Sequence, residues 1–304
     1  MNGSSVHSIL YFSVDTPTKE APEVRRAVGE IVQIEPAWRV RVHSVGPQLV
    51  ICGEDELELQ AIREEIQKTQ LVVFGELKIG YRETIRKSAE AEGKYIRQTG
   101  GVGNYGHCWL RIEPSEPRID YTFVNGSQVG AIPERYIGPI ERGVQNEMGL
   151  GILAGYPMFN LKVTLLDGSY HEVDSNEMAF QFAGSIAFKE AARKAYPVLL
   201  EPVMAVEVIV SEEFMGTIID GINARRGRIE EIENEDESGG LKTIKATVPL
   251  PELLRSSTYG RPEWTMRFAG YQERPHFGRL GGDDAPAPAI KPRGPRPRTD
   301  SAAA

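Results

Sequence analysis

Four glycines stand close together in the chain: Gly100, Gly101, Gly103 and Gly106. Clustered glycines let backbone N–H groups approach an anion, so phosphate binding is the first chemistry to consider. A dinucleotide-binding loop needs a strand before its glycines and a helix after them, whereas β-rich runs at 94–98 and 106–112 lie on both sides here. No GxxxxGK[ST] string exists, because Gly93-Lys94 is followed by Tyr95. The residues predict a glycine-rich hairpin, with no nucleotide or other cofactor.

Two histidines, His107 and His171, are the remaining residues whose type suggests chemistry. The sequence has no GxSxG string for a serine nucleophile and no HExxH string for zinc, so neither histidine stands in a catalytic context. Asp167, Glu172 and Asp174 surround His171, but acidic residues around one histidine in a turn form a solvated loop more often than a metal site. We therefore predict no catalytic residue, no metal ligand and no enzymatic activity.

Composition limits the class of protein. The 304 residues are 40% hydrophobic, which is enough apolar material for two or three domains. No stretch approaches the roughly 18 uncharged apolar residues of a membrane span, and residues 1–7 are too polar for a signal peptide. Cys52 and Cys108 form no CxxC pair, which disfavours a disulfide framework or structural zinc. These features predict a cytoplasmic protein with reduced cysteines and no membrane partner.

The net charge of −8 argues against a strong general attraction to nucleic acid, but the charge is unevenly distributed. Residues 1–85 carry 9 basic and 13 acidic side chains, whereas residues 86–199 carry 12 and 13. Local basic faces are therefore possible in the middle of the chain. The charge pattern permits contact with RNA without predicting it.

The elements that must position these residues follow from periodicity. In the first 85 residues the pattern alternates in the order βαββαβ, which favours a ferredoxin-like domain. The elements lie at 8–14, 20–34, 38–43, 48–52, 54–70 and 71–85. A third segment repeats this logic with strands at 203–210, 227–232, 241–248 and 264–271, a helix at 212–224 and a short helix at 249–254. Beyond Pro275 the composition predicts a disordered tail.

The middle segment combines strands with two helices. Strands are predicted at 94–98, 106–112, 119–123 and 159–166. One helix is predicted from Pro133 to Met148, and a second from Ser175, as its N-cap, to about Lys194. Five alanines and Gly184 recur along the second helix, which indicates close packing on a sheet.

Several ordered strings resemble one family. Residues 92–107 contain EGK, RQTGG and YGH, residues 151–157 read GILAGYP, and residues 167–175 read DGSYHEVDS. The strings MAF, AGS and AFKEA follow between residues 178 and 191, and LEP stands at 200–202. Together these strings resemble domain IV of bacterial elongation factor G.

The resemblance extends to both sides of that segment. YRETI at 81–85 resembles the end of the family's domain III, and NARRG at 223–227 resembles its domain V. The implied α+β fold is a ferredoxin-like domain at 1–85, an elongated βα domain like that of ribosomal protein S5 at 86–198, a second ferredoxin-like domain at 199–274, and a disordered tail at 275–304. The family's GTPase domain and β-barrel are expected to be missing.

In this family domain IV resembles a tRNA anticodon arm, and its tip contacts the mRNA and tRNA in the decoding region of the ribosome. Carried over position by position, the tip comprises Gly100, Gly101, Gly103, Asn104, Tyr105, Ser169, Tyr170, His171 and Asp174. Glycines allow close backbone approach, while Asn104 and His171 can donate to or accept from sugar and phosphate groups. Val102 stands where family members commonly carry a basic residue, and Asn104 where many carry glutamine.

Three arginines, Arg225, Arg226 and Arg228, lie where the family's domain V faces ribosomal RNA. The resemblance implies RNA contact, whereas a solvated helix end is the alternative, because cations also suit the helix dipole there. The tail arginines Arg293, Arg296 and Arg298 suggest either a weak RNA anchor or an inert solubilising tail.

The resemblance implies a translation-elongation, translocation-like factor that binds the ribosome without a GTPase of its own. Its expected partners are ribosomal RNA, the tRNA–mRNA complex and a separate translational GTPase, and it is expected to be a monomer. The alternative is a repurposed or decayed elongation-factor fragment that binds another partner, which Val102 and the acidic outer segments favour.

Overall fold

The structure is a computed structural model that describes residues 9–15, 26, 28–31, 40–45, 48–69, 72–97, 103–115, 120–234, 240–254 and 264–275. The chain divides into two compact units. The first contains residues 1–80 and 201–272, and the second contains residues 81–200 and a stretch that begins at Glu273. The predicted tail lies outside the described residues apart from Pro275. The finer division into three domains stays a prediction.

The first sheet of the first unit is antiparallel and carries the strands predicted at 8–14, 38–43 and 48–52. Its elements are β1 (Leu10–Asp15), β2 (Val40–Val45), β3 (Gln48–Gly53), α2 (Glu56–Thr69), β4 (Val73–Phe74) and β5 (Lys78–Ile79). The strand order is β2-β3-β1-β4, and β5 also pairs with β1. The long strand predicted at 71–85 is instead divided into three short strands, and the last of these, at 82–85, pairs with residues 197–200 and not with this sheet. Leu59, Ile62 and Ile66 form the fully buried face of α2. Of the helix predicted at 20–34, Arg26 and residues 28–31 are described and helical, and the rest lies outside the described residues.

The second sheet of the first unit repeats this architecture. Its elements are β11 (Pro197–Ser211), α5 (Glu212–Ala224), β12 (Arg228–Asn234), β13 (Leu241–Pro249), α6 (Leu250–Leu254) and β14 (Trp264–Glu273). The strand order is β12-β13-β11-β14. Helix α5 turns Ile222 into the core, and Ile218 and Ile219 pack beside it. The short helix and all four predicted strands are therefore present.

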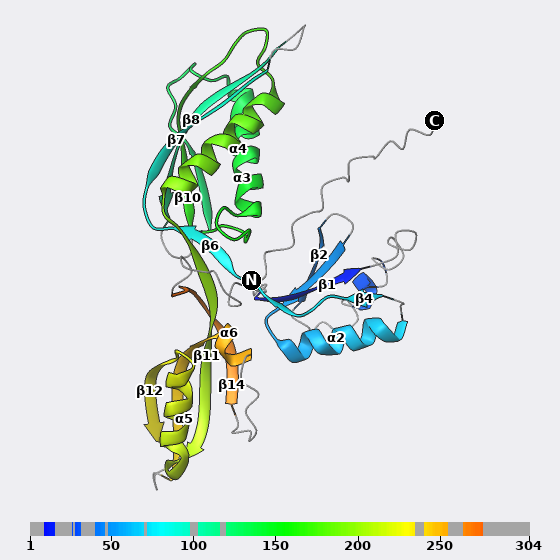
Figure 1. Cartoon of the computed structure of the whole chain (residues 1–304), viewed down its shortest axis with the longest axis vertical. Helices are drawn as coiled ribbons and strands as arrows, with labels where there is room; N and C mark the ends of the chain where they lie inside the picture. The colour runs from blue at the N-terminus through cyan, green and yellow to red at the C-terminus, as the bar shows by residue number, and fades with distance from the viewer. Residues whose placement is uncertain are drawn as a thin grey trace, which may run out of the picture. The chain divides into compact units, whose positions relative to one another are not determined.

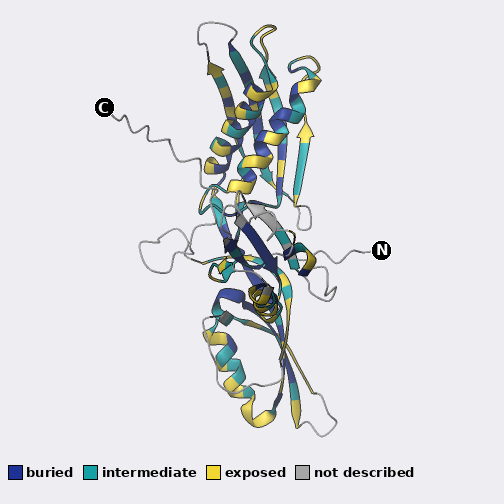
Figure 2. Cartoon of the chain, turned by 90° about the vertical axis from the view of Figure 1, so that its right-hand side faces the viewer, coloured by how far each residue is buried: buried dark blue, intermediate teal, exposed yellow. Residues whose placement is uncertain are grey.

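The second unit is a sheet with helices on one face (Figure 1). Its elements are β6 (Arg82–Ile85), β7 (Ala89–Arg97), β8 (Asn104–Pro114), β9 (Tyr121–Asn125), the 3-10 turn η1 (Glu134–Tyr136), α3 (Ile137–Leu150), β10 (Leu161–Ser169) and α4 (Glu177–Lys194). The strand order is β7-β8-β10-β9, in which only the β9–β10 pair is parallel. Buried residues alternate with more accessible ones along β7 and β8, as expected of a sheet covered on one side (Figure 2).

Close packing between α4 and the sheet explains the small residues of both elements. A Cβ on Gly93 would lie 1.9 Å from the carbonyl oxygen of Ala183, and a Cβ on Gly106 would lie 2.3 Å from that of Ala179. These contacts leave no room for a side chain, so the helix rests directly on the backbone of β7 and β8. The packing predicted from the alanines of this helix is confirmed.

The start of α4 differs from the prediction by one residue. Asn176, not Ser175, is the N-cap, and its Oδ1 accepts a hydrogen bond of 2.9 Å from the Ala179 N–H. Both residue types cap helices well, so sequence alone did not separate them. Ser175 instead donates its hydroxyl to the carbonyl oxygen of Tyr105 over 3.0 Å.

A fully buried carboxylate, Glu83, organises the loop that follows α3. Its Oε2 accepts from the N–H groups of Ile152 and Leu153 at 2.6 and 2.8 Å. Its Oε1 accepts from those of Ala154 and Tyr156 at 2.7 and 3.0 Å. Four backbone donors thus replace the water that a carboxylate would otherwise bind.

Candidate nucleic-acid interface

The structure joins the two segments that carry the predicted tip residues. Gly100, Gly101 and the neighbouring Val102 lie outside the described residues. Tyr105, at the start of β8, forms an isolated parallel bridge with Ser175, just before α4. The Tyr105 N–H donates to the carbonyl oxygen of Asp174 over 2.8 Å. The hairpin end and the β10–α4 loop therefore form one continuous surface.

The Asp174 side chain makes a second hydrogen bond between the two segments. Its Oδ1 accepts from the Gly103 N–H over 2.8 Å. Gly103 is buried, and a Cβ on it would lie 3.0 Å from the Asp174 carboxyl carbon, so a larger residue would crowd this contact. The acidic side chain is 21% exposed, which indicates that it faces the protein more than a ligand.

A polar network lies beneath these contacts. The Ser169 Oγ is 2.7 Å from the Tyr105 Oη and 2.7 Å from the His107 Nδ1. The His107 Nε2 lies 2.8 Å from the Glu92 Oε1, although the direction of approach is not that of a hydrogen bond. Tyr105 and Ser169, both predicted tip residues, thus use their hydroxyl groups within the protein.

Asn104 contacts the cap of α4. Its Oδ1 accepts from the Asn176 Nδ2 over 2.7 Å, while the Asn176 Oδ1 caps the helix. Sequence reasoning missed Asn176. An asparagine directly before a helical pattern is a recognisable N-cap, but the adjacent Ser175 is an equally good candidate.

His171 and Tyr170 are the most exposed members of the predicted tip that the structure describes. The His171 side chain is 55% exposed, and Tyr170 is 41% exposed. The His171 Nδ1 accepts from the N–H groups of Val173 and Asp174 at 3.3 and 3.2 Å. The His171 N–H in turn donates to the Ser175 Oγ over 2.9 Å. The loop therefore holds the imidazole in a defined position at the surface.

The arginine cluster of the first unit is held mainly by protein groups. Arg226 has a left-handed backbone, with φ of 58°, and donates two hydrogen bonds of 2.7 and 2.9 Å to the fully buried carboxylate of Glu201. A second carboxylate, Glu252, accepts from the same guanidinium over 2.9 Å. The hydrogen bond to Glu201 raises the pKa of Arg226 above its usual value, with Glu252 adding to the effect. The alternative that Arg226 is a freely solvated cation at a helix end is therefore wrong.

The other two arginines of the cluster, Arg225 and Arg228, have different surroundings. Arg225 donates its Nη1 to the carbonyl oxygen of Gly221 over 2.7 Å, which satisfies the last turn of α5. Arg228 begins β12 and is exposed. Of the three predicted contacts, Arg228 is the cation best placed to meet an anion.

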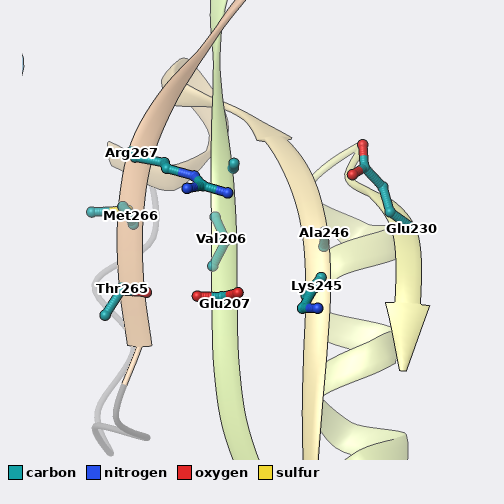
Figure 3. Close-up of a pocket in the computed structure, with 9 residues that line it drawn as sticks. Val206, Glu207, Glu230, Lys245, Ala246, Thr265, Met266 and Arg267 are labelled. Atoms are coloured by element: carbon teal, nitrogen blue, oxygen red, sulfur yellow. The ribbon is translucent and has the colours of Figure 1, made fainter. Parts of the chain in front are cut away.

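Other kinds of site find little support. A small hollow on the second sheet of the first unit is lined by strand residues including Glu207, Lys245 and Arg267 (Figure 3). Lys245 is occupied there, because Glu233 and Glu231 hold its Nζ at 2.7 and 3.1 Å and raise its pKa. Within the described ranges, no group of three His, Cys, Asp or Glu side chains is arranged to hold a metal ion. None of the described helices is long and apolar enough to cross a membrane.

Comparisons with known proteins show what the second unit and the second sheet of the first unit are similar to. The family model described as elongation factor G, domain IV, matches residues 77–196, and the model of the elongation factor G C-terminus matches residues 198–276. The crystal structure of a protein from Thermus thermophilus is similar to this chain, with a TM-score of 0.68 and 35% sequence identity. The similarity covers 88% of this chain but only 41% of the Thermus protein, so the chain spans less than half of that protein's length. The chain belongs to the elongation factor G family, with domain IV followed by the C-terminal domain.

Proposed function

We propose that this protein binds the ribosome and that the end of its domain IV contacts RNA in the decoding region. The observation that carries the proposal is the joining of two loops by the Tyr105–Asp174 and Gly103–Asp174 hydrogen bonds. These loops are the ones through which the resemblance implies RNA contact, and they lie in the segment matched by the domain IV model. A preformed surface loses little conformational freedom on binding.

The proposal assigns binding rather than chemistry to these residues. Asn104 and His171 act as hydrogen-bonding groups toward the RNA backbone, with Gly100 and Gly101 allowing close approach. Arg228, and to a smaller degree Arg225, provides a second contact through the C-terminal domain. On this proposal any coupling to GTP hydrolysis comes from a separate translational GTPase or from sequence outside these 304 residues.

Co-sedimentation with purified ribosomes at rising salt tests this function. Replacing Asn104 and His171 together by alanine removes two neutral hydrogen bonds, each worth about 0.5–1.5 kcal/mol. We expect the ribosome affinity to fall by about fivefold to 150-fold, from the same range of hydrogen-bond energies. Asn146→Ala, an exposed residue near the end of α3 that leads into the Glu83 loop, is the matched control and is expected to bind normally.

Two results would contradict the proposal. One is a wild-type protein that does not sediment with ribosomes even at low salt. The other is a double variant that binds as tightly as Asn146→Ala, which would point to a protein whose domain IV tip has another partner.

A further inference from the structure

The direction of each hydrogen bond at the tip can be read from groups that can only donate. A backbone N–H has no acceptor atom, so the Ala179 N–H fixes the oxygen of Asn176 as the atom that faces it. The Asn176 amide nitrogen is then the atom 2.7 Å from Asn104. That nitrogen also only donates, so the side-chain oxygen of Asn104 is the atom that faces inward.

The same reasoning applies to His171. The N–H groups of Val173 and Asp174 both point at its Nδ1, which therefore carries no proton in this arrangement. In a neutral imidazole the proton then resides on Nε2. No described residue accepts from the His171 Nε2 or from the Asn104 Nδ2, so both donors are available to a ligand.

Three other side-chain acceptors of these two segments are also turned inward, whereas the Glu172 carboxylate is exposed. The Asp174 carboxylate accepts from the Gly103 N–H and lies 3.4 Å from the His171 Nδ1. The Ser175 Oγ accepts from the His171 N–H. The Ser169 Oγ is held between Tyr105 and His107. The Asp174 carboxylate therefore makes contacts within the protein rather than facing a ligand.

We propose that Asn176 is a positioning residue: it holds the side-chain oxygen of Asn104 inward, so that the Asn104 amide nitrogen faces outward and, together with the His171 Nε2, can donate to the acceptor oxygens of an RNA backbone. This inference rests on the proposed function. Phosphate oxygens only accept hydrogen bonds, and the 2′-hydroxyl accepts them readily. A tip that offered the Asn104 oxygen instead would face those atoms with a second acceptor.

The variant Asn176→Asp tests the orientation with the smallest possible change. Aspartate caps helices as well as asparagine does, so the bond to Ala179 and the start of α4 are retained. A carboxylate only accepts, so the Asn104 amide must rotate to donate to it, and its oxygen then faces outward. We expect ribosome affinity to fall by about five- to tenfold, roughly the effect of one lost hydrogen bond, beyond any effect of the new charge.

A double-mutant cycle separates the rotation from the charge. In an Asn104→Ala background there is no amide to rotate, so Asn176→Asp then costs only its electrostatic repulsion from RNA. We expect the loss of affinity caused by Asn176→Asp to be about five to ten times larger with Asn104 present, for one hydrogen bond. Equal losses in the two backgrounds would overturn the inference.

Side-chain amide NMR of the free protein supplies a readout that does not depend on ribosomes. In the wild type we expect the Asn176 NH2 protons to be protected from exchange and those of Asn104 to exchange freely. In Asn176→Asp the Asn104 NH2 protons should become protected. Unchanged Asn104 signals would overturn the positioning role. The expected NMR change with no ribosome binding by any variant would instead contradict the proposed function and the RNA part of this inference.

Discussion

At the scale of single residues, Glu83 explains why two short strings of the family resemblance belong together in the structure. The strings YRETI and GILAGYP are 70 residues apart, yet the glutamate of the first is enclosed by four N–H groups of the second. Gly151, with φ of 67°, begins that loop, and a Cβ on it would lie 2.8 Å from the Glu83 Oε1. A Cβ would also lie 2.2 Å from the Tyr156 carbonyl oxygen, so both the backbone angle and the enclosed carboxylate favour glycine here.

Replacing Glu83 by glutamine is expected to be strongly destabilising. Each carboxylate oxygen serves two backbone donors, so the new amide nitrogen leaves two buried N–H groups without an acceptor, at about 1–3 kcal/mol each. We expect the free energy of unfolding in urea to fall by roughly 2–6 kcal/mol. Glu134→Gln, an exposed carboxylate, is the control and should change it by less than about 0.5 kcal/mol. A stable Glu83→Gln protein would show that the loop does not need the charge.

At the scale of elements, the contact of α4 with β7 and β8 sets the shape of domain IV. Gly106 stands at the point where α4 passes over β8, next to the tip residues Asn104 and Tyr105 in sequence. A Cβ there would lie 2.8 Å from the Phe180 nitrogen as well as 2.3 Å from the Ala179 oxygen. Only a shift of the helix backbone could relieve both contacts.

Gly106→Ala is therefore expected to separate the helix from the sheet. Overpacking of this kind costs about 1–3 kcal/mol, occasionally more, and should appear as a lower thermal midpoint. Gly149→Ala is the matched control, because nothing lies within 4 Å of a Cβ at that position in α3. It should be neutral or stabilising by up to about 1 kcal/mol. Equal midpoints for the two variants would contradict the packing.

The elements themselves were largely predictable, whereas their side-chain contacts were not. Periodicity predicted the strands that became β7 and β8 and the helix that became α4, because each buries one face. The pairing of Asn104 with Asn176 joins residues 72 positions apart, and no local pattern encodes such a contact. The pairing of Arg226 with Glu201 could not be predicted either, because these residues are 25 positions apart. Sequence reasoning assigned these residues by type, and only the fold shows which of their atoms are already used.

At the scale of the whole molecule, the salt dependence of binding reports how many cations meet RNA. The chain carries a net charge of −8, and Arg226 is committed to two carboxylates. The proposed tip offers Asn104 and His171 as neutral donors, which release no counterions. Few charges are thus available to neutralise phosphates.

We therefore expect a shallow slope when the logarithm of the ribosome-binding constant is plotted against that of the salt concentration. Each phosphate neutralised contributes about −0.7 to −0.9 to this slope, so two or three contacts give about −1.4 to −2.7. Arg228→Gln should make the slope shallower by about 1, whereas His171→Ala should lower the affinity and leave the slope unchanged. A changed slope in His171→Ala would mean that the imidazole meets the RNA as a cation, with its Nδ1 turned from the N–H groups of Val173 and Asp174 toward the Asp174 carboxylate.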